Sequence, residues 1–136
     1  MRFILSLGAI GLIGTAVIAA SPVQEDRAAK ETAALEKAIA GKVAGKPVSC
    51  ISLRDIDRSQ NIGENAIIYR ISTNRFYVNK PRGGCSGLRD GRALITRIPT
   101  DRLCNGDVAR VVDLTLGFEG PSCILGDFTP YTKAPS

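Results

Sequence analysis

The sequence predicts a mainly β protein, in which a small antiparallel sheet of five to six strands curls into a barrel or sandwich after one N-terminal helix. Short apolar runs alternate with Gly- and Pro-containing turns over residues 48–129, a pattern typical of small all-β domains. The same region holds four cysteines, and the 136 residues contain no histidine. An apolar segment precedes this region at the N-terminus.

Residues 1–20 are predicted to be a secretory signal peptide. Arg2 supplies a positive charge, and the apolar, uncharged run 3–20 ends in small residues, which together define such a signal. Cleavage after Ala19 or Ala20 fits this pattern. The alternative is an uncleaved anchor, because the run reaches the lower limit for spanning roughly 30 Å of hydrocarbon. We expect a periplasmic or secreted protein with no membrane span after cleavage.

The length that remains after cleavage fits a single domain. Aromatic residues make up 5% of the sequence and tryptophan is absent, so the core is small. A small core gains from cross-links, and an exported chain meets the oxidising conditions that form them. Each disulfide is expected to contribute about 2–4 kcal/mol.

Residues 21–40 are predicted to form the helix. Residues 21–24 combine an N-cap Ser, a Pro at the first position and a Gln at the third, which is the pattern of a capping box. Gly41 suits the position just after the helix. The apolar face is thin, so we expect the helix to dock weakly or to act as a spacer. Residues 41–47 then form a flexible linker, and 21–47 precede the folded body.

The body, 48–129, is predicted to consist of strands joined by turns. Apolar-rich runs predict strands at 48–56, 66–72, 75–80, 92–98, 108–116 and 123–128. Polar and Gly-rich segments predict turns or loops at 60–65, 81–91, 101–106 and 117–121. The tail, 130–136, is expected to be frayed.

The firmest structural prediction is a β-hairpin of 66–72 and 75–80 around the two-residue turn Thr73-Asn74. Placing Ser72 opposite Arg75 pairs Ile71 with Phe76 and Tyr69 with Val78. One face then carries Ile67, Tyr69, Ile71, Phe76 and Val78. The other face carries Ile68, Arg70, Tyr77 and Asn79. Such cross-strand pairs stabilise a sheet by about 0.2–1 kcal/mol each.

Four cysteines allow three disulfide pairings. In an up-and-down meander, Cys50 and Cys104 lie at one end of the sheet and Cys85 and Cys123 at the other, which favours Cys50–Cys104 with Cys85–Cys123. Because the loop around Cys85 is long, Cys85–Cys104 with Cys50–Cys123 stays open. The nearest cysteines are 19 positions apart. That spacing fits neither a Cys-x-x-Cys redox site nor the close pairs of a zinc site.

Several cysteine-centred blocks appear in an order that resembles the domain-of-unknown-function family 6491, a family of small exported bacterial proteins with four cysteines. The blocks are Cys50-Ile51, Ile67-Ile68-Tyr69-Arg70, Tyr77-Val78-Asn79, Cys85-Ser86-Gly87-Leu88, Leu103-Cys104-Asn105-Gly106-Asp107 and Cys123-Ile124-Leu125-Gly126-Asp127-Phe128. The resemblance spans about residues 45–128, and the family often has Pro where this chain has Ser86. It implies export, but it carries no activity or catalytic residue with it.

No catalytic residue, metal ligand or cofactor site is predicted. Without histidine, a Ser-His-Asp or Cys-His arrangement and histidine metal ligation are excluded. Paired carboxylates are conceivable, since Asp101 and Asp107 bracket Cys104, and Glu119 and Asp127 bracket Cys123, but Asp in such positions more often caps a turn. The Gly-rich stretch 83–87 lacks the Gly-Lys-Ser/Thr ending of a phosphate-binding P-loop.

Arginine dominates the charge of the body, with ten Arg and one Lys against six Asp or Glu between Arg54 and Arg110. Arg suits bidentate recognition of carboxylate and phosphate. The predicted anion-binding residues are Arg70, Arg75, Arg82, Arg89 and Arg92. The expected partner is an anionic envelope component or an envelope protein, and export argues against nucleic acid.

These observations favour a non-enzymatic binding or structural module of the cell envelope. One alternative is a small secreted enzyme inhibitor, in which the disulfide-tied loop 81–91 would enter an enzyme cleft. The other is a hydrolase that uses a pair of carboxylates, which must be held about 5–10 Å apart.

Overall fold

The computed structural model describes residues 16–19 and 21–135, so most of the predicted signal peptide lies outside the described residues. This part of the chain contains one α-helix, one short 3-10 helix and ten strands. In chain order they are α1 (Pro22–Ile39), β1 (Lys42–Ala44), β2 (Cys50–Ser52), η1 (Leu53–Asp55), β3 (Arg58–Ile62), β4 (Ala66–Ser72), β5 (Arg75–Asn79), β6 (Arg92–Thr96), β7 (Arg102–Cys104), β8 (Val108–Asp113), β9 (Glu119–Ile124) and β10 (Phe128–Lys133).

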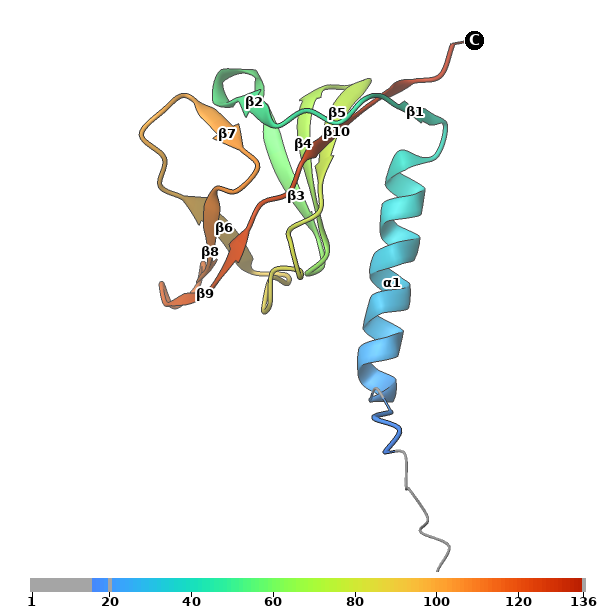
Figure 1. Ribbon diagram of the computed structural model, residues 1–136, viewed down its shortest axis with the longest axis vertical. Helices are drawn as coiled ribbons and strands as arrows, with labels where there is room; N and C mark the ends of the chain where they lie inside the picture. Colours follow the sequence, from blue (N-terminus) through green and yellow to red (C-terminus); the bar gives the residue numbers. More distant parts are fainter. Residues whose placement is uncertain (1–15, 20, 136) are drawn as a thin grey trace, which may run out of the picture.

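The strands form three antiparallel sheets rather than one. A five-stranded sheet has the order β1-β10-β5-β4-β3, a three-stranded sheet has the order β6-β8-β9, and β2 pairs with β7. Figure 1 shows α1 along one side of the five-stranded sheet and strands β6 to β9 on the other side. The predicted mainly β fold with one N-terminal helix is confirmed. The described strands do not close into a barrel, and they are shorter and more numerous than predicted.

Helix α1 docks along the five-stranded sheet. Its bounds match the prediction, but Ser21 accepts the amide of Gln24 (2.9 Å) through its backbone oxygen and its side chain caps nothing. The C-terminal half contacts the sheet through Leu35, Ala38 and Ile39. These side chains cover a cluster made of Ile62, Ala66, Ile68, Phe76 and Val78. The helix is therefore part of the domain and not a detached spacer.

The β4–β5 hairpin is confirmed, but its predicted faces are wrong. Ser72 does pair with Arg75, yet a β-bulge between Arg70 and Ser72 leaves Ile71 unpaired. The bulge shifts the pairing by one residue, so Arg70 faces Phe76 and Tyr69 faces Tyr77. A one-residue slip moves each β5 side chain to the opposite face relative to β4, so Phe76 and Val78 lie on the same face as Ile68. The hairpin therefore buries apolar side chains on both of its faces.

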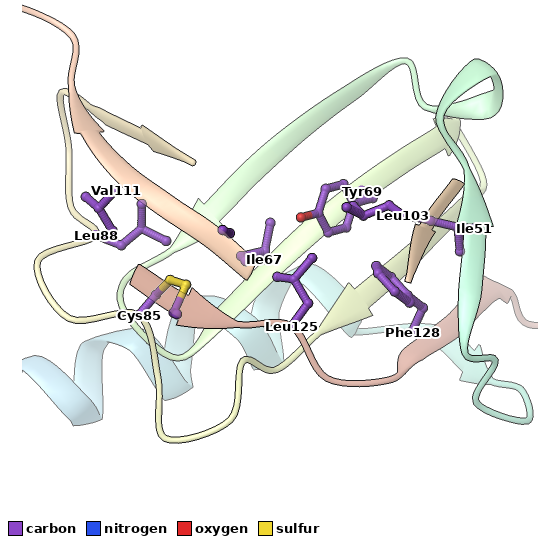
Figure 2. Packing of buried hydrophobic residues seen from close by; sticks show 11 residues of the cluster. Ile51, Ile67, Tyr69, Cys85, Leu88, Leu103, Val111, Leu125 and Phe128 are labelled. Atoms are coloured by element: carbon purple, nitrogen blue, oxygen red, sulfur yellow. A yellow bond between two sulfur atoms is a disulfide. The ribbon is translucent and has the colours of Figure 1, made fainter. Parts of the chain in front are cut away.

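The main core lies between the five-stranded sheet and the other two sheets. Figure 2 shows Ile67 and Tyr69 from β4 directed into the same cluster as side chains from β2, β7 and β8 and from the chain after β9. Tyr69 and Phe128 are tilted rings whose centroids lie 5.8 Å apart. Burial raises the pKa of Tyr69 to about 12. The buried members of the cluster are Ile51, Ile67, Tyr69, Cys85, Leu88, Leu103, Ala109, Val111, Cys123, Leu125 and Phe128.

The predicted flexible linker and frayed tail are corrected by the structure. Within 41–47, strand β1 pairs with β10, which itself lies between β1 and β5. Strand β10 extends into the predicted tail, where Tyr131 stacks on Phe76 with a centroid separation of 5.6 Å. Strand β1 has only three residues, and β10 is interrupted by Pro130, so neither shows a clear strand pattern in the sequence. The predicted strand 48–56 is likewise cut short at β2, and β3 begins before the predicted turn 60–65.

Both favoured disulfides are present, although the predicted meander is not. Cys50 and Cys104 face each other across β2 and β7, with Cα atoms 4.0 Å apart. Cys85, in loop 81–91, is bonded to Cys123 of β9, with Cα atoms 5.1 Å apart. A meander requires segment 48–56 to pair with β4, and the described strands show no such pairing. The Cys50–Cys104 bond forms because β2 crosses over to pair with β7.

Asn79 is a fully buried polar side chain that holds the chain between β9 and β10. Its amide nitrogen donates to the carbonyl of Gly126 (2.7 Å), and its amide oxygen accepts the N–H of Gly126 (3.1 Å). Gly126 is required at this point, because a Cβ there would lie 2.5 Å from the carbonyl oxygen of Lys80. The side chain thus replaces a missing strand partner for both backbone groups.

We expect Asn79→Leu to lower the free energy of unfolding by about 2–3 kcal/mol, because both backbone groups of Gly126 lose their buried partner. Chemical denaturation measures this loss. Asn74→Ala, at the exposed turn of the same hairpin, is the matched control and should change stability little. Equal stability of the two variants would contradict the role given to Asn79.

Candidate functional site

Loop 81–91 is held against the domain at several points. The Arg82 amide donates to the carbonyl of Ile124 (2.9 Å), Cys85 is disulfide-bonded to Cys123, and Leu88 is buried. Gly83, Gly84 and Gly87 have φ between 72° and 81°, the left-handed region that favours glycine. The Gly-rich composition therefore serves a tight, tethered loop. Cys85 and Leu88 face inward, whereas Ser86 between them is exposed.

Glu64, in the turn between β3 and β4, ties this loop to the five-stranded sheet. Its carboxylate accepts the amide of Gly87 (2.7 Å), and its backbone carbonyl accepts the amide of Cys85 (2.7 Å). A phosphate-binding loop needs such amides free for its ligand. In this loop an internal carboxylate already occupies one of them, in agreement with the lack of a P-loop motif.

The N-terminal half of α1 lies opposite this turn and loop. Arg27 is 3.7 Å from the Glu64 carboxylate, and Glu31 accepts a hydrogen bond of 2.5 Å from the Asn65 amide. Glu31 also lies directly over Gly63, where a Cβ would overlap the glutamate side chain. Gly63 has a φ of 58° as well. The close approach of helix and turn thus depends on glycine at this position.

Between these elements runs a groove, which we call the α1–loop groove. It consists of two adjoining cavities of about 620 and 480 Å³ that share Arg27, Glu31 and Arg89. Helix α1 forms one wall, and loop 81–91 with the β3–β4 turn forms the other. The charged side chains that line it are Arg27, Glu31, Glu64, Arg89, Asp90 and Arg92.

Two of the five predicted anion-binding arginines line the groove. Arg89 is exposed and forms no ion pair within residues 16–19 and 21–135. Arg92, at the start of β6, lies 3.7 Å from Asp113 and keeps part of its side chain exposed. Together with Arg27, they place three guanidinium groups along one groove.

The other three predicted arginines lie elsewhere. Arg75 donates to the Tyr77 hydroxyl (3.1 Å) on one face of the hairpin. Arg70 is predicted on the same face as Tyr77, but the bulge turns it to the opposite face. There its guanidinium carbon lies 5.5 Å from the centre of the Phe76 ring. Arg82 donates to the side chain of Asn105. The five arginines predicted to bind an anion are therefore divided among separate surfaces.

Arg27 is not among the predicted site residues, because the helix was expected only to dock weakly or to act as a spacer. A helical repeat of 3.6 residues places Arg27, Glu31 and Leu35 on one face. Because Leu35 contacts the sheet, Arg27 faces the same side of the helix. The spacing from Leu35 was thus the signal in the sequence, and it becomes informative once the helix is known to dock.

The carboxylates considered as a catalytic pair have separate structural contacts. Asp107 accepts the amide of Cys104 (2.7 Å), which is the predicted turn-capping role. Asp101 lies 3.7 Å from Arg54, and Asp127 accepts the Asn105 amide (2.6 Å). Glu119 is paired with two arginines of the three-stranded sheet. Glu119 lines a cavity with Arg97 and Arg110 that the other three carboxylates do not share.

Comparison with protein-family models, with curated proteins and with solved structures found no match to this chain. Among the described residues, no group of three or more acidic or cysteine side chains is arranged to hold a metal ion. No helix in the described part of the chain is both long and apolar enough to span a membrane. The geometry of the groove is therefore the basis for the functional argument.

We expect Glu64→Ala to loosen loop 81–91, because the Gly87 amide loses its charged acceptor. Hydrogen exchange at Gly87 should become faster, and stability should fall by about 1–2 kcal/mol. Glu64→Gln keeps an acceptor oxygen and should restore part of the protection. Asp90→Ala, which removes a neighbouring carboxylate with no such contact, is the control. Unchanged exchange at Gly87 in Glu64→Ala would contradict this role.

Proposed function

We propose that the protein is an exported, disulfide-stabilised, non-enzymatic module that binds an anionic component of the cell envelope in the α1–loop groove. The observation that carries this proposal is the set of three guanidinium groups along one groove. Guanidinium groups bind carboxylate and phosphate in a bidentate manner and keep their charge at all physiological pH values. The groove is wide enough for a sugar-sized or phosphate-bearing group rather than for a single small ion.

Within the groove, Arg89 is the main contact for an anion. The carboxylates of Glu64 and Asp113 already lie near Arg27 and Arg92, whereas Arg89 is free of such a partner among the described residues. Glu31 is engaged by Asn65. A polyanion would therefore contact Arg89 first. Arg27 and Arg92 would contribute the part of each guanidinium group that its carboxylate partner leaves free.

The proposed location rests on the apolar N-terminal run, the two disulfides and the resemblance to a family of exported proteins. Disulfides persist in oxidising compartments, which include the periplasm and the extracellular space. The alternative of a secreted inhibitor receives less support, because Cys85 and Leu88 are buried and Ser86 is the one exposed residue between them. An inhibitory loop must present its centre to the enzyme cleft.

Binding of two soluble polyanions, inorganic polyphosphate and polygalacturonate, tests the proposal with phosphate and carboxylate ligands. Arg89→Ser should weaken binding about tenfold, since a charge-assisted hydrogen bond contributes about 1.5–3 kcal/mol. Affinity should also fall steeply between low and high salt. Arg75→Ser is the matched control, because Arg75 is exposed but lies outside the groove. Equal losses in the two variants, or no binding to either polymer, would contradict the proposal.

A further inference from the structure

The turn between β8 and β9 presents three large apolar side chains to water. Leu114, Leu116 and Phe118 are 67%, 68% and 71% exposed, the highest values for large apolar side chains after Val23 in the body and helix described. We call residues 113–119 the hairpin tip. Exposed apolar residues that cluster at one point of a surface commonly mark an interaction site.

The hairpin tip is an ordered turn. The Asp113 carboxylate accepts the amides of Thr115 and Leu116 (both 2.9 Å), and its carbonyl accepts the amide of Gly117 (2.9 Å). The hydrogen bonds from Leu116 and Thr115 hold the pKa of Asp113 below its usual value. The amide of Leu114 donates to the carbonyl of Gly91 (3.0 Å), which ties the tip to loop 81–91. The turn thus holds its apolar side chains away from the core.

Basic side chains stand behind the tip. Arg97 follows β6 and lies 3.2 Å from Glu119, and Arg110 of β8 lies 2.7 Å from the same carboxylate. Both arginines keep half or more of their side chains exposed. Arg92 lies beside Asp113 at the base of the turn. An apolar tip followed by guanidinium groups matches the depth profile of a lipid surface, in which acyl chains lie beneath phosphate groups.

The size and position of the tip favour a bilayer over a protein partner. Three side chains offer far less than the roughly 800 Å² per partner that a stable protein interface buries. In Figure 1 the tip lies toward the same end of the molecule as the N-terminal end of α1. A small apolar tip with basic side chains behind it therefore fits a bilayer surface better than a protein interface.

We propose that the hairpin tip inserts Leu114, Leu116 and Phe118 into the surface of an anionic lipid bilayer, with Arg97 and Arg110 at the level of the lipid phosphates. This site lies beside the α1–loop groove, and Arg92 borders both. It would anchor the module at a membrane face while leaving the groove open to a second ligand. Insertion of the hairpin tip does not depend on whether the groove binds polyanions.

Phe118→Trp provides a direct reporter, because the chain contains no other tryptophan. Vesicles of phosphatidylethanolamine and phosphatidylglycerol should shift the emission of this tryptophan to shorter wavelength, and brominated lipids should quench it. Vesicles of phosphatidylcholine alone should bind the protein more weakly, because they carry no net charge. An emission spectrum that vesicles leave unchanged would overturn the proposal.

The double variant Leu116→Ser/Phe118→Ser should weaken co-sedimentation with the anionic vesicles at least about tenfold, since it removes two large apolar side chains from the bilayer. The control is Val43→Ser/Leu53→Ser, which alters two exposed apolar residues outside the three-stranded sheet and its arginines. Thermal unfolding verifies that both variants fold. Equal vesicle binding by the two variants, or a tip-dependent dimer in analytical ultracentrifugation without lipid, overturns the proposal. An uncleaved N-terminal run would itself bind both variants to vesicles, so the mass of the purified protein is determined first.

Discussion

The Cys85–Cys123 disulfide is the constraint on which the functional surfaces of this domain depend. It joins loop 81–91, which follows the five-stranded sheet, to β9 of the three-stranded sheet. Among the described strands no ladder joins these two sheets, although an isolated bridge pairs Arg82 with Ile124. The Cys50–Cys104 bond acts within the pair of β2 and β7. Because the bonded cysteines are 54 and 38 positions apart, a chain-entropy estimate gives about 4 kcal/mol for each bond. A domain with three small sheets gains much from such links.

Both proposed surfaces lie beside this loop. One side of the loop forms a wall of the α1–loop groove, and the carbonyl of Gly91 accepts a hydrogen bond from the hairpin tip. Glu64 and the docked helix complete the groove. Loop 81–91 therefore connects the core to both the groove and the hairpin tip. No residue of α1 is buried, so few contacts hold the helical wall of the groove in place. The apolar tip is instead fixed by its own hydrogen bonds.

Much of the fold was readable from the sequence because its signals are local. Short apolar runs predicted the central strands, the Thr73-Asn74 turn predicted the hairpin, and Gly41 marked the end of the helix. The bulge at Ile71 could not be predicted from the sequence, because it depends on how both faces of the hairpin pack. Strands β1 and β10 were missed because their pairing joins residues nearly ninety positions apart, β1 has only three residues and β10 is interrupted by Pro130. For the site, charge identified Arg89 and Arg92, but only the docking of α1 brings Arg27 to them.

The central claim is that two specific disulfides hold the sheets and loop 81–91 in this arrangement. Peptide mapping under non-reducing conditions, on protein purified natively after export, tests it most directly. The account predicts peptides linked through Cys50–Cys104 and through Cys85–Cys123, with all four cysteines oxidised. A peptide linked through Cys85–Cys104, or free thiols at these positions, would contradict it.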